Sequence, residues 1–386
     1  MSVKTVTIIG AGIAGLVAAL AFARKGVATT LVDQAAALQE VGAGLQMSPN
    51  ASYVLDQLGI LEGLRKVWNE PQSIELFSGT SLKPIARVPA GQFALERWGS
   101  PYGDLHRATL QKYLLEAVGK APLVRLVLGT KIETEADINA ISGGEPDLIV
   151  GADGVWSRFR KFIPGAQRPR FSGMVAWRFV IPLRDMPSFL NSNNVTAYLG
   201  PSAHFITYPL KEAGFMNLVA LSSGSNPGET WSAECSPSHR AEMTAQFSCW
   251  HKDIRSLLAY APKATWWPLF GVPKGRWTDG RKRVLIGDAA HAMTPFAAQG
   301  AAMAIEDAFE LAGMVSGDRP LDEALAAFEN RRSLRTERVA ARGAFNKFAY
   351  HARGPFRFGR DIVLSLRKPE SIAADLDWLY GYRAAG

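Results

Sequence analysis

Cysteine is nearly absent from this sequence, because Cys235 and Cys249 are the only two in 386 residues. They lie fourteen positions apart and form no Cys-x-x-Cys pair, which argues against a disulfide framework and against a zinc site. The six histidines show no metal-ligand spacing, so no metal is expected. A reducing cytoplasm is therefore the default compartment.

The sequence also lacks internal repeats, low-complexity tracts and the Gly-x-x-x-x-Gly-Lys loop that cradles phosphates in P-loop proteins. Hydrophobic residues make up 47% of the chain, and its mean hydropathy is near zero. A chain of this length and composition is expected to be soluble, to bury a large core and to form about two domains.

One apolar run, Val6 to Ala23, has Thr7 as its only polar residue and approaches the length of a membrane span. A secretory signal is not convincing, since it would need a basic first segment and an Ala-x-Ala-like cleavage site. The run also contains three glycines and changes halfway from β-branched to alanine-rich residues. This change favours a strand followed by a helix, with a membrane helix as the alternative.

The three glycines form the pattern Gly-x-Gly-x-x-Gly directly after the β-branched residues. Gly10 permits a tight turn, Gly12 lets the backbone approach a pyrophosphate, and Gly15 lets the helix pack on the strand. Asp33 ends the next predicted strand, Thr29 to Val32, where a carboxylate can accept hydrogen bonds from a ribose. The pattern predicts a dinucleotide site but does not distinguish NAD from FAD.

A second strand-to-helix segment begins at Arg283 and reaches Gly-Asp288-Ala-Ala-His. Pro295 and Gly300 bracket a turn, and Ala301 to Ala312 is predicted to be a helix. The carboxyl end of a strand followed by a helix N-terminus is where open α/β folds hold charged and polyhydroxylated ligands.

A third segment, Asp147 to Gly151, is again an apolar strand, followed by Asp153 and by Ser157 and Arg160 at helix-start spacing. In this order the three motifs resemble those of the single-component FAD-dependent aromatic hydroxylases of the para-hydroxybenzoate hydroxylase type. That family carries Gly-x-Gly-x-x-Gly, then Gly-Ala-Asp-Gly-x-x-Ser-x-x-Arg, then Gly-Asp-Ala-Ala-His-x-x-x-Pro. The trio in register makes the resemblance specific, although each motif alone is weak.

The rest of the chain is also similar to this family. The Gly42 to Ala51 segment, the helix start at His106-Arg107 and the ending from Asp377 to Tyr382 each match a family segment. The likeness is greatest to the branch that contains 3-hydroxybenzoate 6-hydroxylase, salicylate hydroxylase and 6-hydroxynicotinate 3-monooxygenase. It therefore covers essentially the whole sequence.

The resemblance implies an α/β fold, in which a Rossmann-like FAD-binding domain is interleaved with a β-sheet substrate domain and followed by C-terminal helices. The expected segments are 1–71, 100–170 and 271–320 for the FAD-binding domain, 72–99 and 171–270 for the substrate domain, and 321–386 for the C-terminal helices.

The activity that the resemblance implies is monooxygenation of a small hydroxylated aromatic or pyridine carboxylic acid, through a flavin C4a-hydroperoxide. FAD would stay bound, O2 would be consumed, and NADH or NADPH would be a transient co-substrate, because the chain has no second Gly-x-Gly-x-x-Gly. Two alternatives stay open: a flavoprotein of the same fold that oxygenates a non-phenolic substrate or acts as a reductase, and a non-catalytic flavin-binding protein.

The cofactor site that the resemblance implies consists of glycines, charged residues and backbone donors: Gly10, Gly12, Ala14, Gly15, Asp33, Gly44, Arg107, Asp153, Arg160, Asp288, Pro295, Gly300 and Ala301. Asp288 matches the carboxylate that binds the ribityl chain, and Pro295 matches the residue beside the isoalloxazine ring. Asp33 stands where the family commonly has glutamate, whose reach is longer.

The substrate side is assigned to Gln46, His204, Tyr208, Pro295 and Gln299, with His204 and Tyr208 as the catalytic pair. If residues 204 to 208 form a strand, both side chains share one face. A histidine titrates near neutrality and can hold a phenolic proton, whose loss near pH 7 otherwise requires roughly 4 kcal/mol. The alternative is a packed core histidine beside a packing tyrosine.

Positive charge is concentrated near the C-terminus, where Arg331 to Lys368 carry a net charge of +9 in a chain of net charge +8. Solvated helix faces are the favoured interpretation, ahead of attraction for anionic small molecules. No aromatic-rich RNA motif accompanies the charge, so no nucleic-acid partner is expected. We expect small-molecule partners only, no membrane span, and a monomer or homodimer.

Overall fold

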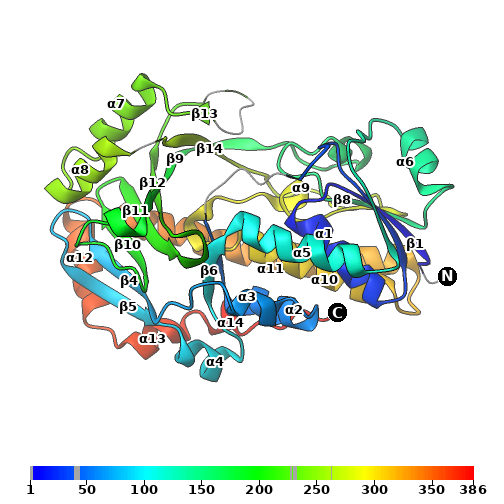
Figure 1. Ribbon diagram of the computed structural model, residues 1–386, viewed down its shortest axis with the longest axis horizontal. Coiled ribbons are helices and arrows are strands. Elements are labelled where there is room, and N and C mark those ends of the chain that lie inside the picture. The colour runs from blue at the N-terminus through cyan, green and yellow to red at the C-terminus, as the bar shows by residue number, and fades with distance from the viewer. Residues whose placement is uncertain (1–2, 39–43, 227, 229–232, 262) are drawn as a thin grey trace.

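The computed structural model describes residues 3–38, 44–226, 228, 233–261 and 263–386. Gly42 and Ala43, part of the family-like segment above, lie outside the described residues. The molecule is elongated, with a parallel sheet toward one end, a large antiparallel sheet toward the other, and helices running between them (Figure 1). The predicted α/β class is confirmed.

The parallel sheet contains the three family-like segments. Its strands follow the order β15 (Arg283–Leu285), β8 (Leu148–Gly151), β1 (Thr5–Ile9), β2 (Ala28–Val32) and β7 (Val124–Val127). All five end level with one another, because Ile9 lies opposite both Val32 and Gly151, Gly151 lies opposite Leu285, and Val32 lies opposite Val127. The loops that follow these strands therefore meet at one edge of the sheet.

Two glycines make the first of these loops possible. Gly10 has φ +104°, and a Cβ there would lie 2.4 Å from the Ala152 carbonyl oxygen. A Cβ at Gly15 would lie 1.8 Å from the Gly10 carbonyl oxygen. A side chain at either position would separate β1 from α1 (Ile13–Arg24) or from the neighbouring loop.

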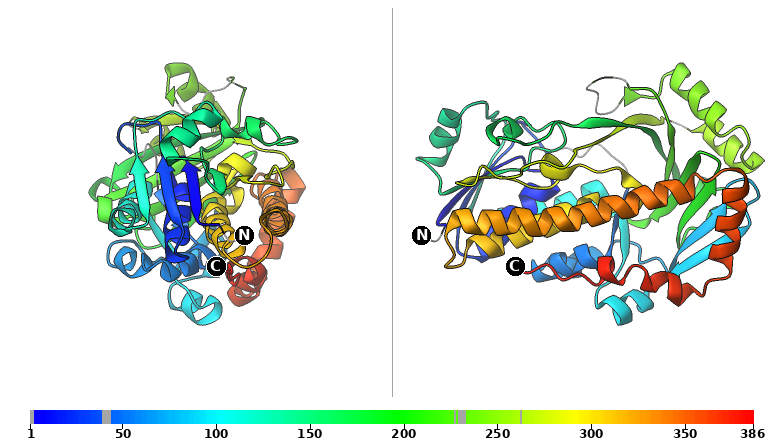
Figure 2. Two further views of the ribbon diagram at one scale, coloured as in Figure 1. Left: turned by 90° about the vertical axis from the view of Figure 1, so that its right-hand side faces the viewer. Right: turned by 180° about the vertical axis from the view of Figure 1, so that it is seen from behind.

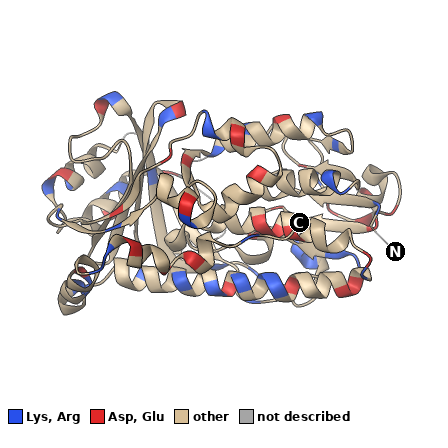
Figure 3. Cartoon of the chain, turned by 90° about the horizontal axis from the view of Figure 1, so that it is seen from below, with Lys and Arg blue, Asp and Glu red and all other residues tan. Residues whose placement is uncertain are grey.

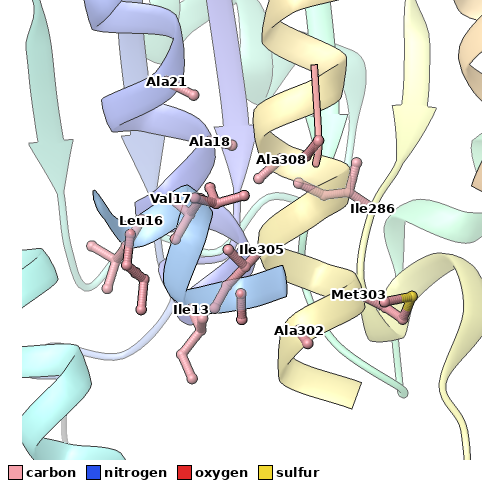
Figure 4. Packing of buried hydrophobic residues seen from close by; sticks show 14 of the residues in the cluster. Ile13, Leu16, Val17, Ala18, Ala21, Ile286, Ala302, Met303, Ile305 and Ala308 are labelled. Carbon is pink, nitrogen blue, oxygen red and sulfur yellow. The ribbon is translucent and has the colours of Figure 1, made fainter. Parts of the chain in front are cut away.

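Small residues let helix α1 lie close to α10 (Gly300–Val315). Figure 4 shows Ala18 and Ala21 of α1 on the side of α10, with Ala302, Ile305 and Ala308 of α10 facing them. Nine of the twelve residues of α1 are buried. The apolar run from Val6 to Ala23 is thus a strand and a core helix. Among the described residues, no helix is long and apolar enough to cross a membrane.

The large sheet has eight strands in the order β13 (Ala233–Glu234), β14 (Thr265–Gly271), β9 (Arg170–Pro182), β12 (Phe215–Ser223), β11 (Ala203–Leu210), β10 (Val195–Gly200), β4 (Ser73–Ser78) and β5 (Pro84–Pro89). All neighbours are antiparallel except β10 and β4. Except for Arg170 at the start of β9 and Gly271 at the end of β14, the strands of this sheet fall in the segments expected for a substrate domain, and the domain boundaries stay a prediction.

A separate two-stranded antiparallel sheet is formed by β3 (Gly44–Met47) and β6 (Gly103–His106). The remaining helices before the C-terminal region are α2 (Pro49–Gln57), α3 (Leu61–Arg65), α4 (Gln92–Trp98), α5 (Arg107–Lys120), α6 (Glu135–Ser142), α7 (Pro237–Gln246), α8 (Lys252–Tyr260) and α9 (Asp288–His291), with short 3-10 turns at Phe159–Phe162, Leu183–Asp185, Lys211–Ala213 and Pro295–Ala297. Arg160 therefore lies within a 3-10 turn and Ser157 lies just before it, whereas the spacing predicted the start of a helix here.

The C-terminal helices are α11 (Leu321–Tyr350), α12 (Gly354–Ser365), α13 (Pro369–Ala374) and α14 (Asp377–Tyr380). Helix α11 runs along most of the molecule and leads to α12 at the end away from the N-terminus (Figure 2). Blue and red segments are mixed along α11 in Figure 3, so its surface is not a single positive field.

Candidate functional site

A cavity of about 340 Å³ lies where the loops of the parallel sheet face the large sheet. Ten of the predicted site residues line it: Gly12, Ala14, Gly44, Gln46, Arg107, Tyr208, Asp288, Pro295, Gly300 and Ala301. The large sheet supplies apolar walls: Ile206, Val219, Leu221, Trp267, Leu269 and Phe270. Residues far apart in the sequence thus meet at the switch region where α/β folds bind ligands.

The glycine-rich loop leaves room for a ligand. A Cβ built on Gly12 would have no atom within 4 Å, although Gly12 lines the cavity. Gly10 and Gly15 do not line the cavity and act by allowing the turn. Asp33 also lies outside the lining: its carboxylate accepts hydrogen bonds from the backbone N–H of Ala11 at 2.7 Å and of Ala35 at 2.8 Å.

The N-terminus of α10 points its first backbone donors at the cavity. The first hydrogen bond within this helix runs from the Met303 N–H to the Gln299 carbonyl oxygen. The N–H groups of Gly300, Ala301 and Ala302 therefore have no acceptor within the helix. Because a sixteen-residue helix carries partial positive charge at this end, the site favours an anion or an electron-rich edge of a ligand.

Gln299 is placed differently from the expectation that it lines the substrate side. Its side chain is buried, donates to the Ser48 hydroxyl at 2.9 Å and accepts from the Asn50 amide at 3.1 Å. It is absent from the cavity lining. The reason is its position as N-cap of α10, where its side chain turns toward α2 and away from the cavity.

Behind this helix start lies a buried ionic cluster that sequence reasoning missed. Arg332 of α11 donates to Glu306 and to Asp307 of α10, each at 2.7 Å, and all three side chains are fully buried. Arg335 also binds Glu306, which in turn accepts from Asn50. The expectation that basic residues of α11 cover solvated faces is wrong for these two arginines.

The same cluster reaches the loop after β15. Asp307 accepts hydrogen bonds from the Gly287 N–H at 2.9 Å and from the His291 ring. Burial alone would raise the pKa of the Asp307 carboxyl, but His291, Arg332 and these hydrogen bonds lower it to about 2. The charged cluster thus connects α11 to both cavity-lining segments of this region, the Asp288 loop and the start of α10.

Asp153 and Arg160 shape the neighbouring loop and do not line the cavity. Asp153 accepts from the N–H groups of Arg158 and Phe159. The Arg160 guanidinium donates hydrogen bonds to the carbonyl oxygens of Val155, Asp288 and Ala289. Both residues hold loops that border the cavity. Neither side chain lines it, so the geometry does not favour the direct contact with a cofactor that the resemblance implies.

Tyr208 lines the cavity and packs against Gly44, whose added Cβ would lie 2.4 Å from the Tyr208 ring. No described residue hydrogen-bonds to its hydroxyl. Burial raises the pKa of Tyr208, so its hydroxyl stays protonated and can donate. Gln46 of β3 accepts a hydrogen bond of 2.7 Å from the Tyr102 hydroxyl and also lines the cavity.

His204 shares a strand face with Tyr208 but does not line the cavity. The two are four residues apart, a distance of ~13 Å along a strand. The His204 ring packs 5.2 Å from the Phe296 ring, and its Nδ1 lies 2.8 Å from Nε2 of His351. Its own Nε2 is buried with no hydrogen-bond partner among the described residues. Burial lowers the pKa of His204 well below its usual value, so the ring is neutral.

Arg178 of β9 lines the cavity and was missed by sequence reasoning. Its guanidinium lies 4.9 Å from the Trp267 ring centre and makes no hydrogen bond or ion pair with a described residue. Burial lowers the pKa of the Arg178 guanidinium. The available signal was a lone charged residue in an otherwise apolar strand from Met174 to Pro182.

These residues fit FAD. Open space at Gly12 and Gly300 would admit the pyrophosphate and the flavin edge without a clash with side chains. The free N–H groups at the start of α10 and the carboxylate of Asp288 offer the donors and the acceptor that such a ligand requires. The remaining acceptor sites of Asp33 are available for ribose hydroxyls.

Sequence comparison finds relatives over nearly the whole chain. The profile of the FAD binding domain family matches residues 3–342. A 3-hydroxybenzoate 6-hydroxylase of Aquipseudomonas alcaligenes is 36% identical, with 98% of each chain covered. A 6-hydroxynicotinate 3-monooxygenase of Bordetella bronchiseptica is 32% identical over 86% of this chain and 89% of its own.

Structural comparison agrees on the fold. HpxO of Klebsiella pneumoniae, solved in complex with FAD and uric acid, matches with a TM-score of 0.81. The match covers 98% of this chain and 96% of that chain, at 22% sequence identity. At this identity the likeness concerns the fold alone.

Proposed function

The chain belongs to the FAD-binding family of flavoprotein monooxygenases, and we propose that it hydroxylates a small hydroxylated aromatic or pyridine carboxylic acid with NAD(P)H and O2. The observation that carries the substrate assignment is the cavity itself. It combines a helix N-terminus suited to a flavin with Arg178, whose guanidinium lies over the Trp267 ring and forms no hydrogen bond or ion pair with the described residues, and with a protonated Tyr208.

FAD, when bound, supplies the redox chemistry, since it accepts a hydride from NAD(P)H and activates O2. We assign the ribityl chain to Asp288 and the pyrophosphate to the loop at Gly12. The N–H groups of Gly300 and Ala301 would stabilise negative charge on the pyrimidine edge of the flavin. Arg107 would lie on the phosphate side.

The substrate's carboxylate is assigned to Arg178. A guanidinium binds a carboxylate through two parallel N–H···O bonds, which fixes orientation as well as position. The ring of the substrate would lie among the apolar walls, such as Ile206, Leu221 and Trp267. These walls also exclude water, which would otherwise divert the reaction to hydrogen peroxide.

Proton handling is assigned to the β11 face. Tyr208 is the group that touches the substrate hydroxyl, and it donates a hydrogen bond that stabilises the phenolate. His204 does not line the cavity, so we assign it an indirect role: its Nε2, which has no hydrogen-bond partner among the described residues, would receive the proton from behind Phe296. The burial that keeps the ring neutral also makes it a weak base, so it would relay a proton rather than hold it.

We propose a cytoplasmic location and small-molecule partners. A cytoplasmic site of action agrees with the two free cysteines, Cys235 and Cys249. Small molecules remain the proposed partners, in keeping with the mixed charges of α11.

The first prediction concerns cofactor and activity. The purified protein incubated with FAD is expected to give a flavin absorption spectrum. A panel of hydroxylated benzoates and pyridine carboxylates is then assayed for stimulated NADH or NADPH oxidation with matched oxygen uptake. At least one small aromatic acid is expected to stimulate both.

Each other outcome of this assay points to a different function. Absence of a flavin spectrum would contradict FAD binding. Stimulation only by neutral heteroaromatic compounds would favour a non-phenolic substrate, and NAD(P)H oxidation without oxygen transfer would favour a reductase. FAD binding without any turnover would leave a flavin-binding protein.

The second prediction separates Tyr208 from His204. Tyr208→Phe removes the donor to the phenolate and is expected to lower the hydroxylation rate ~10²-fold, with more NAD(P)H lost as hydrogen peroxide. His204→Ala is expected to slow hydroxylation and raise peroxide release in the same way. Both variants should keep the flavin spectrum. If His204→Ala leaves rate and coupling unchanged, His204 is a packing residue only.

A further inference from the structure

Two histidines from distant parts of the chain are joined by a hydrogen bond behind the cavity. Nδ1 of His204, on β11, lies 2.8 Å from Nε2 of His351, the residue at which α11 ends. The centres of the two rings are 5.1 Å apart. At this separation one ring must donate its N–H and the other must accept, so the two imidazoles have complementary tautomers.

The pair extends from the wall of the cavity toward the surface. Leu221, which lies opposite His204 in the β11–β12 register, lines the cavity, and so does Ile206, two residues along the same strand face. His204 is fully buried immediately beyond these residues. His351 is only partly buried, and its Nδ1 forms no hydrogen bond with the described residues, which leaves that atom to water.

Several contacts hold the outer imidazole in place. The Ser202 N–H, in the turn before β11, donates to the His351 carbonyl oxygen at 3.1 Å. Arg353 donates to the Ser202 hydroxyl, which joins the chain after α11 to the same turn. The Phe296 ring packs against both imidazoles, at 5.2 Å from His204 and 5.5 Å from His351. The short distance between the two nitrogens is therefore built into the fold.

Both imidazoles are neutral near pH 7. Burial lowers the pKa of His204, and burial together with the charges of Lys347 and Arg353 lowers the pKa of His351 to about 4. The other titratable group against the pair is Tyr350, whose ring lies 5.5 Å from His204. A neutral imidazole can accept a proton at one nitrogen while it releases one from the other. The nearby cations disfavour a lasting imidazolium, so an arriving proton is passed on to water.

A closed site needs such a route. Ionisation of a phenol inside the cavity produces a proton that must leave, although the apolar walls exclude bulk water. Two hydrogen-bonded imidazoles can move the proton without opening the cavity, because only N–H bonds form and break along the path.

We propose that His351 is the outer member of a two-histidine relay that carries the phenolic proton from His204 to solvent, an inference that rests on the proposed hydroxylase function. His204 takes the proton at Nε2, which is the step assigned to it above, and gives its Nδ1 proton to Nε2 of His351. His351 then releases its own Nδ1 proton to water. Protonation of the product phenolate runs the same steps in reverse and restores both tautomers, so the path needs no oxidant or reductant.

The experiment is stopped-flow mixing of the full chain, loaded with FAD, with the best aromatic acid of the panel and a pH indicator, without NAD(P)H. The phenolate absorption band reports ionisation of the substrate, and the indicator reports the proton in solution. The wild type is expected to show both. His351→Gln is expected to slow both by about 10²-fold, because the glutamine oxygen accepts the His204 N–H but an amide does not pass a proton on.

His351→Gln keeps the hydrogen bond, so a purely structural role for His351 predicts the wild-type rate. His239→Gln, which alters a partly buried histidine stacked on Trp266 at 4.3 Å, is the matched control and should also keep that rate. His351→Ala provides a second measurement: added imidazole is expected to restore part of the lost rate, since a free imidazole can replace the missing ring. The flavin spectrum and the dissociation constant of the aromatic acid verify that each variant is folded.

The outcomes separate this inference from the proposed function. Wild-type proton release in His351→Gln, or no rescue of His351→Ala by imidazole, overturns the relay. So does a wild type that hydroxylates the substrate but releases no proton when it binds. If His204→Ala is slow while both His351 variants are normal, the proton leaves His204 by another route and the proposed function stands. If no aromatic acid is hydroxylated by the wild type, the proposed function and the relay are both overturned.

Discussion

Replacement of Arg178 by Met is expected to raise the KM for a small aromatic acid by about two orders of magnitude or more. The reason is that truncating one partner of a buried, hydrogen-bonded charge pair costs roughly 2–5 kcal/mol, part of which is the remaining unpaired charge. Met keeps most of the volume beside Trp267, so the flavin spectrum and the fold should persist. Steady-state kinetics on the best substrate of the panel measure the effect.

The carboxamide analogue of that substrate sharpens this test. The wild-type protein should prefer the acid over the amide, and Arg178→Met should lose most of that preference. Arg184→Met is the matched control, because the Arg184 side chain lies just beyond β9 and is 86% exposed. Equal losses for the acid and the amide would contradict a carboxylate contact, since they would indicate general damage to the cavity.

The largest effect on stability is expected from Arg332→Met. Its removal leaves Glu306 and Asp307 buried beside α11 without their shared cation. Breaking a buried ion pair by removing one partner costs about 3–5 kcal/mol. We expect the apparent melting temperature to fall by roughly 10 °C, and FAD to bind more weakly because the same cluster holds the Asp288 loop and the start of α10.

Arg338→Met is the control for this change. Arg338 lies on the same helix, is exposed and stacks 4.0 Å from the Trp378 ring, so its loss is worth only about 0.5–1 kcal/mol. Thermal unfolding followed by flavin fluorescence measures both variants. If Arg332→Met melts within a few degrees of the wild type, the cluster does not support the site in the way the structure suggests.

The sequence motifs were enough to predict a dinucleotide site on an α/β fold, and the resemblance to the hydroxylase family identified FAD as the cofactor. Gly10, Gly12, Gly15, Asp153 and Asp288 belong to short segments in which each strand, turn and helix follows directly along the chain. Their chemistry is local: a glycine is needed where a Cβ would strike the backbone, and that requirement appears in the sequence as a fixed spacing.

Only the tertiary structure decided which of the predicted residues face the cavity. Gln299, Asp153 and Arg160 belong to the right motifs, but their side chains turn toward neighbouring loops and backbone groups. His204 lies on the right strand face, but the Phe296 ring packs against it. Spacing places a residue on a loop or a face, whereas its direction depends on which partners the folded chain brings within hydrogen-bond distance.

The pairing of distant charges was also beyond the sequence. Arg332 and Arg360 look like their exposed neighbours in a basic segment, yet one is buried against α10 and the other against the end of α11. Arg178 is a lone cation in an apolar strand until the fold places it on the same sheet wall of the cavity as Tyr208. Local patterns determine the elements, because they act over a few residues; burial and ion pairing depend on residues tens to hundreds of positions apart, and those contacts exist only once the chain has folded.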